Sequence, residues 1–99
     1  MNVDEAKRRL AALAKENIRF NEPHFTNQLL LREGKHSEVL EHITQPTALV
    51  KVVSQPSKYG DTKHALHFAT NDKTIILPVI FDDKGLYILT YIKRHRRTT

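Results

Sequence analysis

Apolar residues change their spacing once along the chain, from a helical period to an alternating one. Before Pro46 they recur at steps of three and four residues, which predicts helices over residues 4–16 and 24–32 and a short third helix with Ser37 as its N-cap. Between the first two helices, Ile18–Phe20 alternates and predicts a short strand. Pro46 cannot continue the third helix, so the helical part is expected to end there.

After Pro46, apolar residues recur at every second position, which is the period of a β-strand. Alternating and β-branched runs predict strands over residues 48–53, 63–68, 74–81 and 86–92. The third run is apolar on both faces, which is typical of a central strand. Pro78 lacks a ladder donor, so we expect a bulge at Pro78. The order of elements predicts an α+β fold, with N-terminal helices packed on a four-stranded antiparallel β-meander.

The 99 residues suffice for one domain. We divide it into an N-terminal helix over residues 1–17, a short strand with two helices over 18–46, and a sheet with a basic end over 47–97. Pro23 suits the first position of the second helix, and Gly34 is expected to end that helix in the left-handed conformation.

Charge is concentrated at the C-terminal end. The chain has 16 Lys and Arg against 11 Asp and Glu, a net charge of +5. Four of the cations fall within five residues: Lys93, Arg94, Arg96 and Arg97. A local cationic patch indicates a polyanionic partner, and a solvated tail is the alternative.

Composition excludes several other classes. The chain has no cysteine, which rules out disulfides, Cys-based zinc sites and a thiol nucleophile. Its apolar runs are too short to cross a bilayer, and its start lacks the apolar region of a signal peptide. We therefore expect a cytoplasmic protein without a membrane partner. With three glycines and no Gly-rich phosphate loop, no cofactor is expected.

The last predicted strand carries the first candidate site. Alternation predicts that one face bears Tyr87, Leu89, Tyr91, Lys93 and His95, and the other bears Arg94. Histidine can move a proton near neutral pH, cations can stabilise a charged phosphorus transition state, and tyrosine can stack on a base. The combination suits phosphodiester cleavage. Cross-strand packing of the tyrosines beside a solvated terminus is the alternative reading.

Histidines elsewhere give weaker signals. His67 shares a predicted face with Lys63 and is a second candidate for proton transfer, whereas His64 shares its face with Leu66 and Phe68 and is expected to be partly buried. His24 and Arg32 lie eight residues apart, which places them roughly on one side of the second helix. No metal-binding spacing appears, so no metal is expected.

Residues 23–46, PHFTNQLLLREGKHSEVLEHITQP, resemble the opening of RelE/ParE-like toxin domains of the barnase–EndoU–colicin–RelE type. The closer similarity is to an uncharacterised branch with a His-Ala-x-x-Arg helix followed by a four-stranded meander. The matching positions are His24, Arg32, Gly34, Val39, Ile43 and Pro46. Phe25, Gln28 and Glu33 depart from the pattern of that branch.

This resemblance implies metal-independent cleavage of RNA, often messenger RNA and in some cases ribosome-bound, restrained by an antitoxin protein. It points to Tyr91, Arg94 and His95 at the C-terminal end and to Lys63 or His67 on the earlier strand, with His24 and Arg32 matching the helix motif. Lys93, Arg96 and Arg97 are expected to contact nucleic acid. Two alternatives stay open: a non-catalytic RNA- or DNA-binding module, and a subunit that binds an acidic protein segment. A homodimer is a further candidate assembly.

Overall fold

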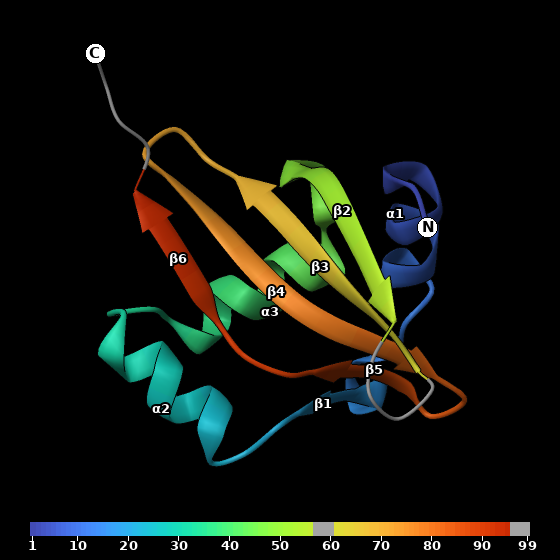
Figure 1. Cartoon of the computed structure of the whole chain (residues 1–99), viewed down its shortest axis with the longest axis horizontal. Coiled ribbons are helices and arrows are strands. Elements are labelled where there is room, and N and C mark those ends of the chain that lie inside the picture. The colour runs from blue at the N-terminus through green and yellow to red at the C-terminus, as the bar shows by residue number, and fades with distance from the viewer. Residues whose placement is uncertain (57–60, 96–99) are drawn as a thin grey trace.

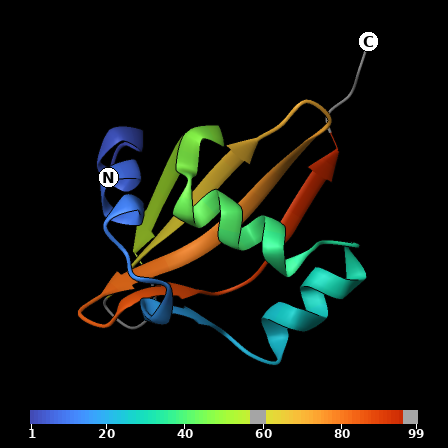
Figure 2. The same ribbon diagram turned by 180° about the vertical axis from the view of Figure 1, so that it is seen from behind.

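Helices cover one face of a twisted sheet (Figures 1 and 2). The computed structural model describes residues 1–56 and 61–95. The helical elements are α1 (Val3–Ala11), η1 (Lys15–Asn17), α2 (His24–Leu31), α3 (His36–Thr44) and η2 (Pro46–Ala48). The strands are β1 (Ile18–Phe20), β2 (Leu49–Pro56), β3 (Thr62–Ala69), β4 (Lys73–Asp82), β5 (Gly85–Ile88) and β6 (Ile92–His95).

The sheet runs in the order β1-β5-β4-β3-β2, and β6 also pairs with β4. All pairs are antiparallel except β1 with β5, which is parallel. The α+β prediction is therefore confirmed. The sheet differs from the expected four-stranded antiparallel meander, because its described part has six strands and one parallel pair.

The interruption between β5 and β6 lies opposite Pro78. Register pairs on either side of it are Val79 with Ile88 and Ile76 with Ile92. Between these two pairs the β5–β6 segment advances by four residues, from 88 to 92, whereas β4 advances by only three, from 79 to 76. The extra residue in the β5–β6 segment is a β-bulge. The Pro78 carbonyl accepts a 2.8 Å hydrogen bond from the Leu89 amide, so the proline nitrogen points to the same edge without a hydrogen to donate. The expected bulge therefore lies in the last strand, while β4 pairs regularly with β3 through Pro78.

The hydrophobic core lies between the helices and the sheet. Each helix buries two residues of one face: Ala6 and Leu10 from α1, Phe25 and Leu29 from α2, and Val39 and Ile43 from α3. The sheet contributes every second residue of its strands, including Leu66, Phe68, Ile75, Leu77, Val79, Leu86 and Ile88. The burial of His64 at 9% exposure agrees with the expectation from its alternation. No helix in the described ranges is long and apolar enough to cross a membrane.

The end of α2 corrects one expectation. Glu33, with φ of 54°, takes the left-handed position that was expected for Gly34. The Glu33 amide donates to the Leu30 carbonyl at 3.2 Å, and the Gly34 amide donates to the Leu29 carbonyl at 2.8 Å. This is the Schellman arrangement, with Glu33 where glycine is usual. Gly34 is required for a different reason: a Cβ there would lie 2.7 Å from the ring of Tyr91.

Candidate functional site

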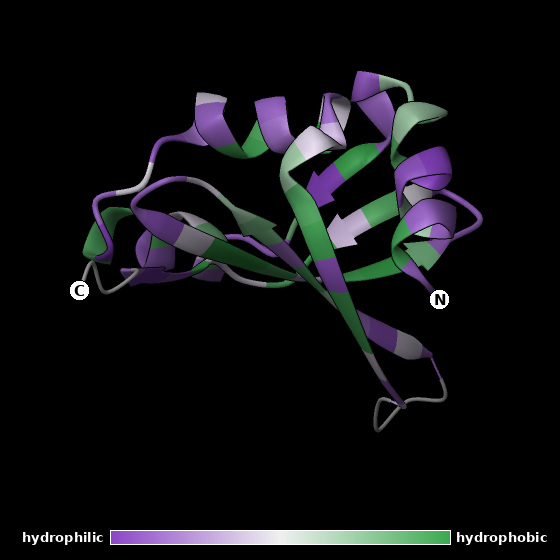
Figure 3. Cartoon of the chain, turned by 90° about the horizontal axis from the view of Figure 1, so that it is seen from above, coloured by the Kyte–Doolittle hydropathy of each residue, from purple (hydrophilic) through white to green (hydrophobic). Residues whose placement is uncertain are grey.

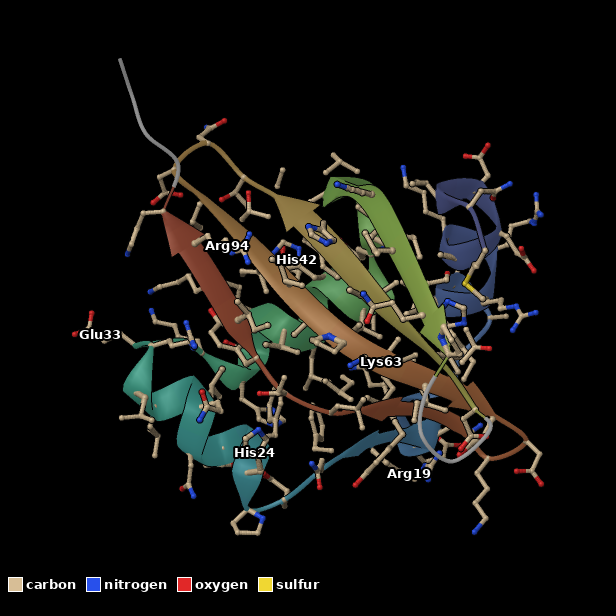
Figure 4. The ribbon with its side chains drawn as sticks, in the orientation of Figure 1. Arg19, His24, Glu33, His42, Lys63 and Arg94 are labelled. Atoms are coloured by element: carbon tan, nitrogen blue, oxygen red, sulfur yellow. The ribbon has the colours of Figure 1, made fainter. Side chains whose placement is uncertain are left out.

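The face of the sheet turned away from the helices carries a row of basic side chains. Strand register places these residues on it: Arg19, Lys51, Lys63, Ala65, His67, Thr74, Ile76, Pro78, Ile80, Tyr87, Ile92 and Arg94. We call this the open face. In Figure 3 helix α3 lies on the other side of the sheet, and no described helix covers the open face. Lys63 and Arg94 mark the extent of the row in Figure 4.

His67 lies at the centre of the basic row. Lys51 is its register partner on β2, and Ile76 is its partner on β4. Arg94 on β6 pairs with Thr74, two residues along β4 from Ile76. Burial lowers the pKa of His67, and the charges of Lys51 and Arg94 lower it further. A lowered pKa favours the neutral form of the His67 imidazole, the form that can accept a proton, and His67 has a cation on each side.

The surface between these cations is apolar. Ile76 on β4 is only 5% exposed although no described helix covers this face. Pro78 is buried in the same way, and Ile80 and Ile92 are half-buried. An apolar floor with a basic rim suits a single-stranded polyanion whose bases lie flat while its phosphates meet the cations.

Arg19 and Tyr87 form the far end of the open face. Nη2 of Arg19 lies 2.6 Å from both carboxylate oxygens of Asp82, and its guanidinium carbon lies 5.3 Å from the centre of the Tyr87 ring. The Tyr87 hydroxyl donates to Oδ1 of Asn21 at 3.0 Å. The hydrogen bond from Arg19 lowers the pKa of Asp82. Arg19 is thus neutralised by a partner, whereas the Tyr87 ring is fixed at the surface.

A second basic group lies at the edge of the helical side. The end of α2 and the strand β6 enclose a cleft of about 260 Å³, lined by Leu31, Arg32, Glu33, Lys93 and His95. Three of the predicted site residues, Arg32, Lys93 and His95, are therefore brought together from positions about 60 residues apart in the chain. Arg94 is separated from them, since it points to the open face.

The prediction that Tyr87 shares a face with Tyr91, Lys93 and His95 was wrong, although the last three do lie on one side of the sheet. The bulge between β5 and β6 reverses the alternation, so Tyr87 lies on the open face and Tyr91 in the core at 0% exposure. Tyr91 meets Phe25 edge-to-face at 6.4 Å, and burial raises its pKa. A ring in this position cannot stack on a base, so Tyr91 is a packing residue.

The remaining predicted residues lie apart from both groups. Nε2 of His24 lies 3.1 Å from Oγ1 of Thr90, so this histidine joins the first turn of α2 to the segment between β5 and β6. His24 is the first residue of α2 and Arg32 is its C-cap, so the two lie at opposite ends of the helix. Figure 4 shows His24 at one end of α2 and Glu33, the residue after Arg32, beyond the other end. Arg96 and Arg97 lie outside the described residues.

Sequence reasoning missed Lys51 as a partner of His67. The sequence predicted a strand that contains Lys51, but it did not predict the register of that strand against β3. A register shift between Leu49 and Lys51 sets that alignment, and it leaves Val50 59% exposed. Without that shift Lys51 would occupy the opposite face of the sheet.

Within residues 1–56 and 61–95, no group of three or more His, Asp or Glu side chains is arranged to hold a metal ion. The chain matches no protein-family model, no curated protein sequence and no solved structure.

Proposed function

We propose that the protein binds single-stranded RNA on the open face and cleaves it without a metal ion, with His67 as the general base. The observation that carries the proposal is the position of His67 on an uncovered sheet face, with Lys51 opposite and Arg94 nearby. The lowered pKa of His67 agrees with the role of a general base. The resemblance of residues 23–46 to RelE-like toxins supports the same activity.

The chemistry follows from the three side chains. His67 takes the proton of a ribose 2′-hydroxyl, whose oxygen attacks the adjacent phosphorus. Arg94 stabilises the negative charge on the phosphorane oxygens. The bond from phosphorus to the 5′ oxygen then breaks, and Lys51 supplies the proton to that departing oxygen. The products are a 2′,3′-cyclic phosphate and a 5′-hydroxyl end.

Cleavage of a labelled RNA in excess EDTA tests this mechanism. We expect wild-type protein to cleave and His67→Asn to lose about 10²-fold or more in rate, as removal of a general base does. Lys84→Ala, which removes an exposed cation on the β4–β5 turn away from His67, is the control and should cleave normally. A substrate with a single 2′-deoxy sugar at the cleaved position should resist.

Cleavage by His67→Asn at the wild-type rate, or of the 2′-deoxy substrate, would overturn the mechanism. Binding without any cleavage by wild-type protein would leave a nucleic-acid-binding module instead of an enzyme. RNA binding by His67→Asn, measured alongside its circular dichroism spectrum, separates loss of chemistry from loss of fold.

A further inference from the structure

An exposed apolar surface adjoins the basic cleft at the end of α2. Leu30 and Leu31 are 69% and 76% exposed, and with Asn27 they line a hollow of about 490 Å³. Leu31 also lines the cleft that contains Arg32, Lys93 and His95, so the two hollows are neighbours. We call Asn27, Leu30, Leu31, Arg32, Lys93 and His95 the α2–β6 surface.

The exposure of these leucines is unusual for this chain. Helix α2 already buries Phe25 and Leu29 against the core, and these two residues anchor it. Leu30 and Leu31 therefore face away from the core and gain nothing from folding. Among the described residues only Val50 is another large apolar side chain with comparable exposure, and it stands alone on β2. Two adjacent exposed leucines over a hollow indicate a binding surface.

Charge decides what kind of partner fits. Beside the leucines the cleft presents the side chains of Arg32, Lys93 and His95 against a single acid, Glu33. A second copy of this chain would bring the same cations face to face across a two-fold axis, and like charges in contact cost affinity. An acidic segment would meet them favourably.

We propose that the α2–β6 surface binds an acidic peptide segment of a partner protein. The segment places an apolar side chain over Leu30 and Leu31, and its carboxylates pair with Arg32 and Lys93. This binding is independent of RNA cleavage, since Lys93 and His95 lie on the opposite face of β6 from Arg94.

Selection from a random peptide display library against the whole protein tests the proposal. Enriched peptides are expected to carry two or more Asp or Glu residues within three positions of Leu, Ile or Phe. A synthetic copy of the most enriched peptide is then titrated by calorimetry. We expect Leu30→Ser/Leu31→Ser and Arg32→Ser/Lys93→Ser each to weaken its affinity at least tenfold. Val50→Ser and Lys84→Ser are the matched apolar and charged controls and should change it less than twofold.

Four outcomes would overturn the proposal. In the selection, these are a failure to enrich any peptide and the enrichment of peptides without acidic residues. In the titration, it is a peptide affinity that neither double variant changes. In sedimentation, it is a dimer of the wild-type protein that Leu30→Ser/Leu31→Ser dissociates. The last would assign the surface to a second copy. Because the substituted side chains are exposed or line an open cleft, the variants are expected to fold, and their unfolding midpoints check this.

Discussion

The ring of Tyr91 lies directly against the backbone of Gly34. A Cβ built at Gly34 would lie 2.7 Å from Cζ of Tyr91 and 2.7 Å from Cδ1 of Leu29. This contact joins the end of α2 to the segment that precedes β6, and it holds the two walls of the basic cleft together.

Gly34→Ala should therefore destabilise the protein. The added methyl cannot fit without moving the Tyr91 ring or the helix end, and overpacking of this kind costs about 1–3 kcal/mol. Urea unfolding measures the change. Lys35→Ala, at the next and exposed position, is the control and should shift the free energy of unfolding by less than about 0.5 kcal/mol. Equal stability of Gly34→Ala and wild type would show that the contact is looser than described.

Glu33→Gly should have the opposite effect. Glu33 holds a φ of 54°, and the left-handed region costs a side-chain-bearing residue about 1 kcal/mol relative to glycine. We expect a gain of that order in the free energy of unfolding by urea. Glu41→Gly is the matched control, because Glu41 is an exposed residue inside α3, where glycine costs about 0.5–1 kcal/mol. A loss at both positions would contradict the prediction.

Lys73 should depend on Glu38 for its contribution to stability. Nζ of Lys73 lies 2.9 Å from Oε2 of Glu38, and the two side chains are only 21% and 28% exposed. Lys73→Met leaves a poorly solvated carboxylate without its partner, which should cost about 1–3 kcal/mol. Adding Glu38→Gln should restore part of that loss, and a double-mutant cycle by urea unfolding measures the coupling. Additive single effects would show that the pair is not coupled. Glu5→Gln removes the more exposed Arg9 pair and should cost little.

Stability should fall as the pH drops below neutrality. Burial lowers the folded-state pKa of His42, His64 and His67 below the usual value for histidine of about 6.5. Below about pH 6.5 the unfolded chain therefore binds more protons than the folded chain, so the free energy of unfolding decreases until the folded-state pKa values are passed. Urea unfolding at pH 7.5 and pH 5 measures this. His42→Gln/His64→Gln should lose less stability across that interval, and a loss equal to that of wild type would assign the dependence to other groups.

RNA affinity should depend on salt through the cations of the open face. Each phosphate contact contributes about 0.7 to the slope of log affinity against log salt for a single strand. Lys51→Ala and Arg94→Ala should each lower the slope by about that amount, as measured by fluorescence anisotropy with a short RNA. Lys84→Ala should leave it unchanged. Slopes unaffected by the first two variants would place the RNA elsewhere on the molecule.

Local sequence patterns were sufficient to predict most of the helices and strands and many of the buried core residues. Three- and four-residue apolar steps identified α1, α2 and α3, and alternation in β3 separated buried His64 from His67. These features depend on the period of side chains along a single helix or strand, so they can be read from the chain itself.

The two clusters of candidate residues depended on the tertiary structure. Strand register decides that Lys51 stands opposite His67, and the bulge facing Pro78 decides that Tyr91 enters the core while Tyr87 stays at the surface. Arg32 reaches Lys93 and His95 only because α2 ends against β6. The sequence alone determined which residue types were available and their local alternation. The tertiary structure determined which of them meet, because a one-residue shift in a strand moves every following side chain to the other face.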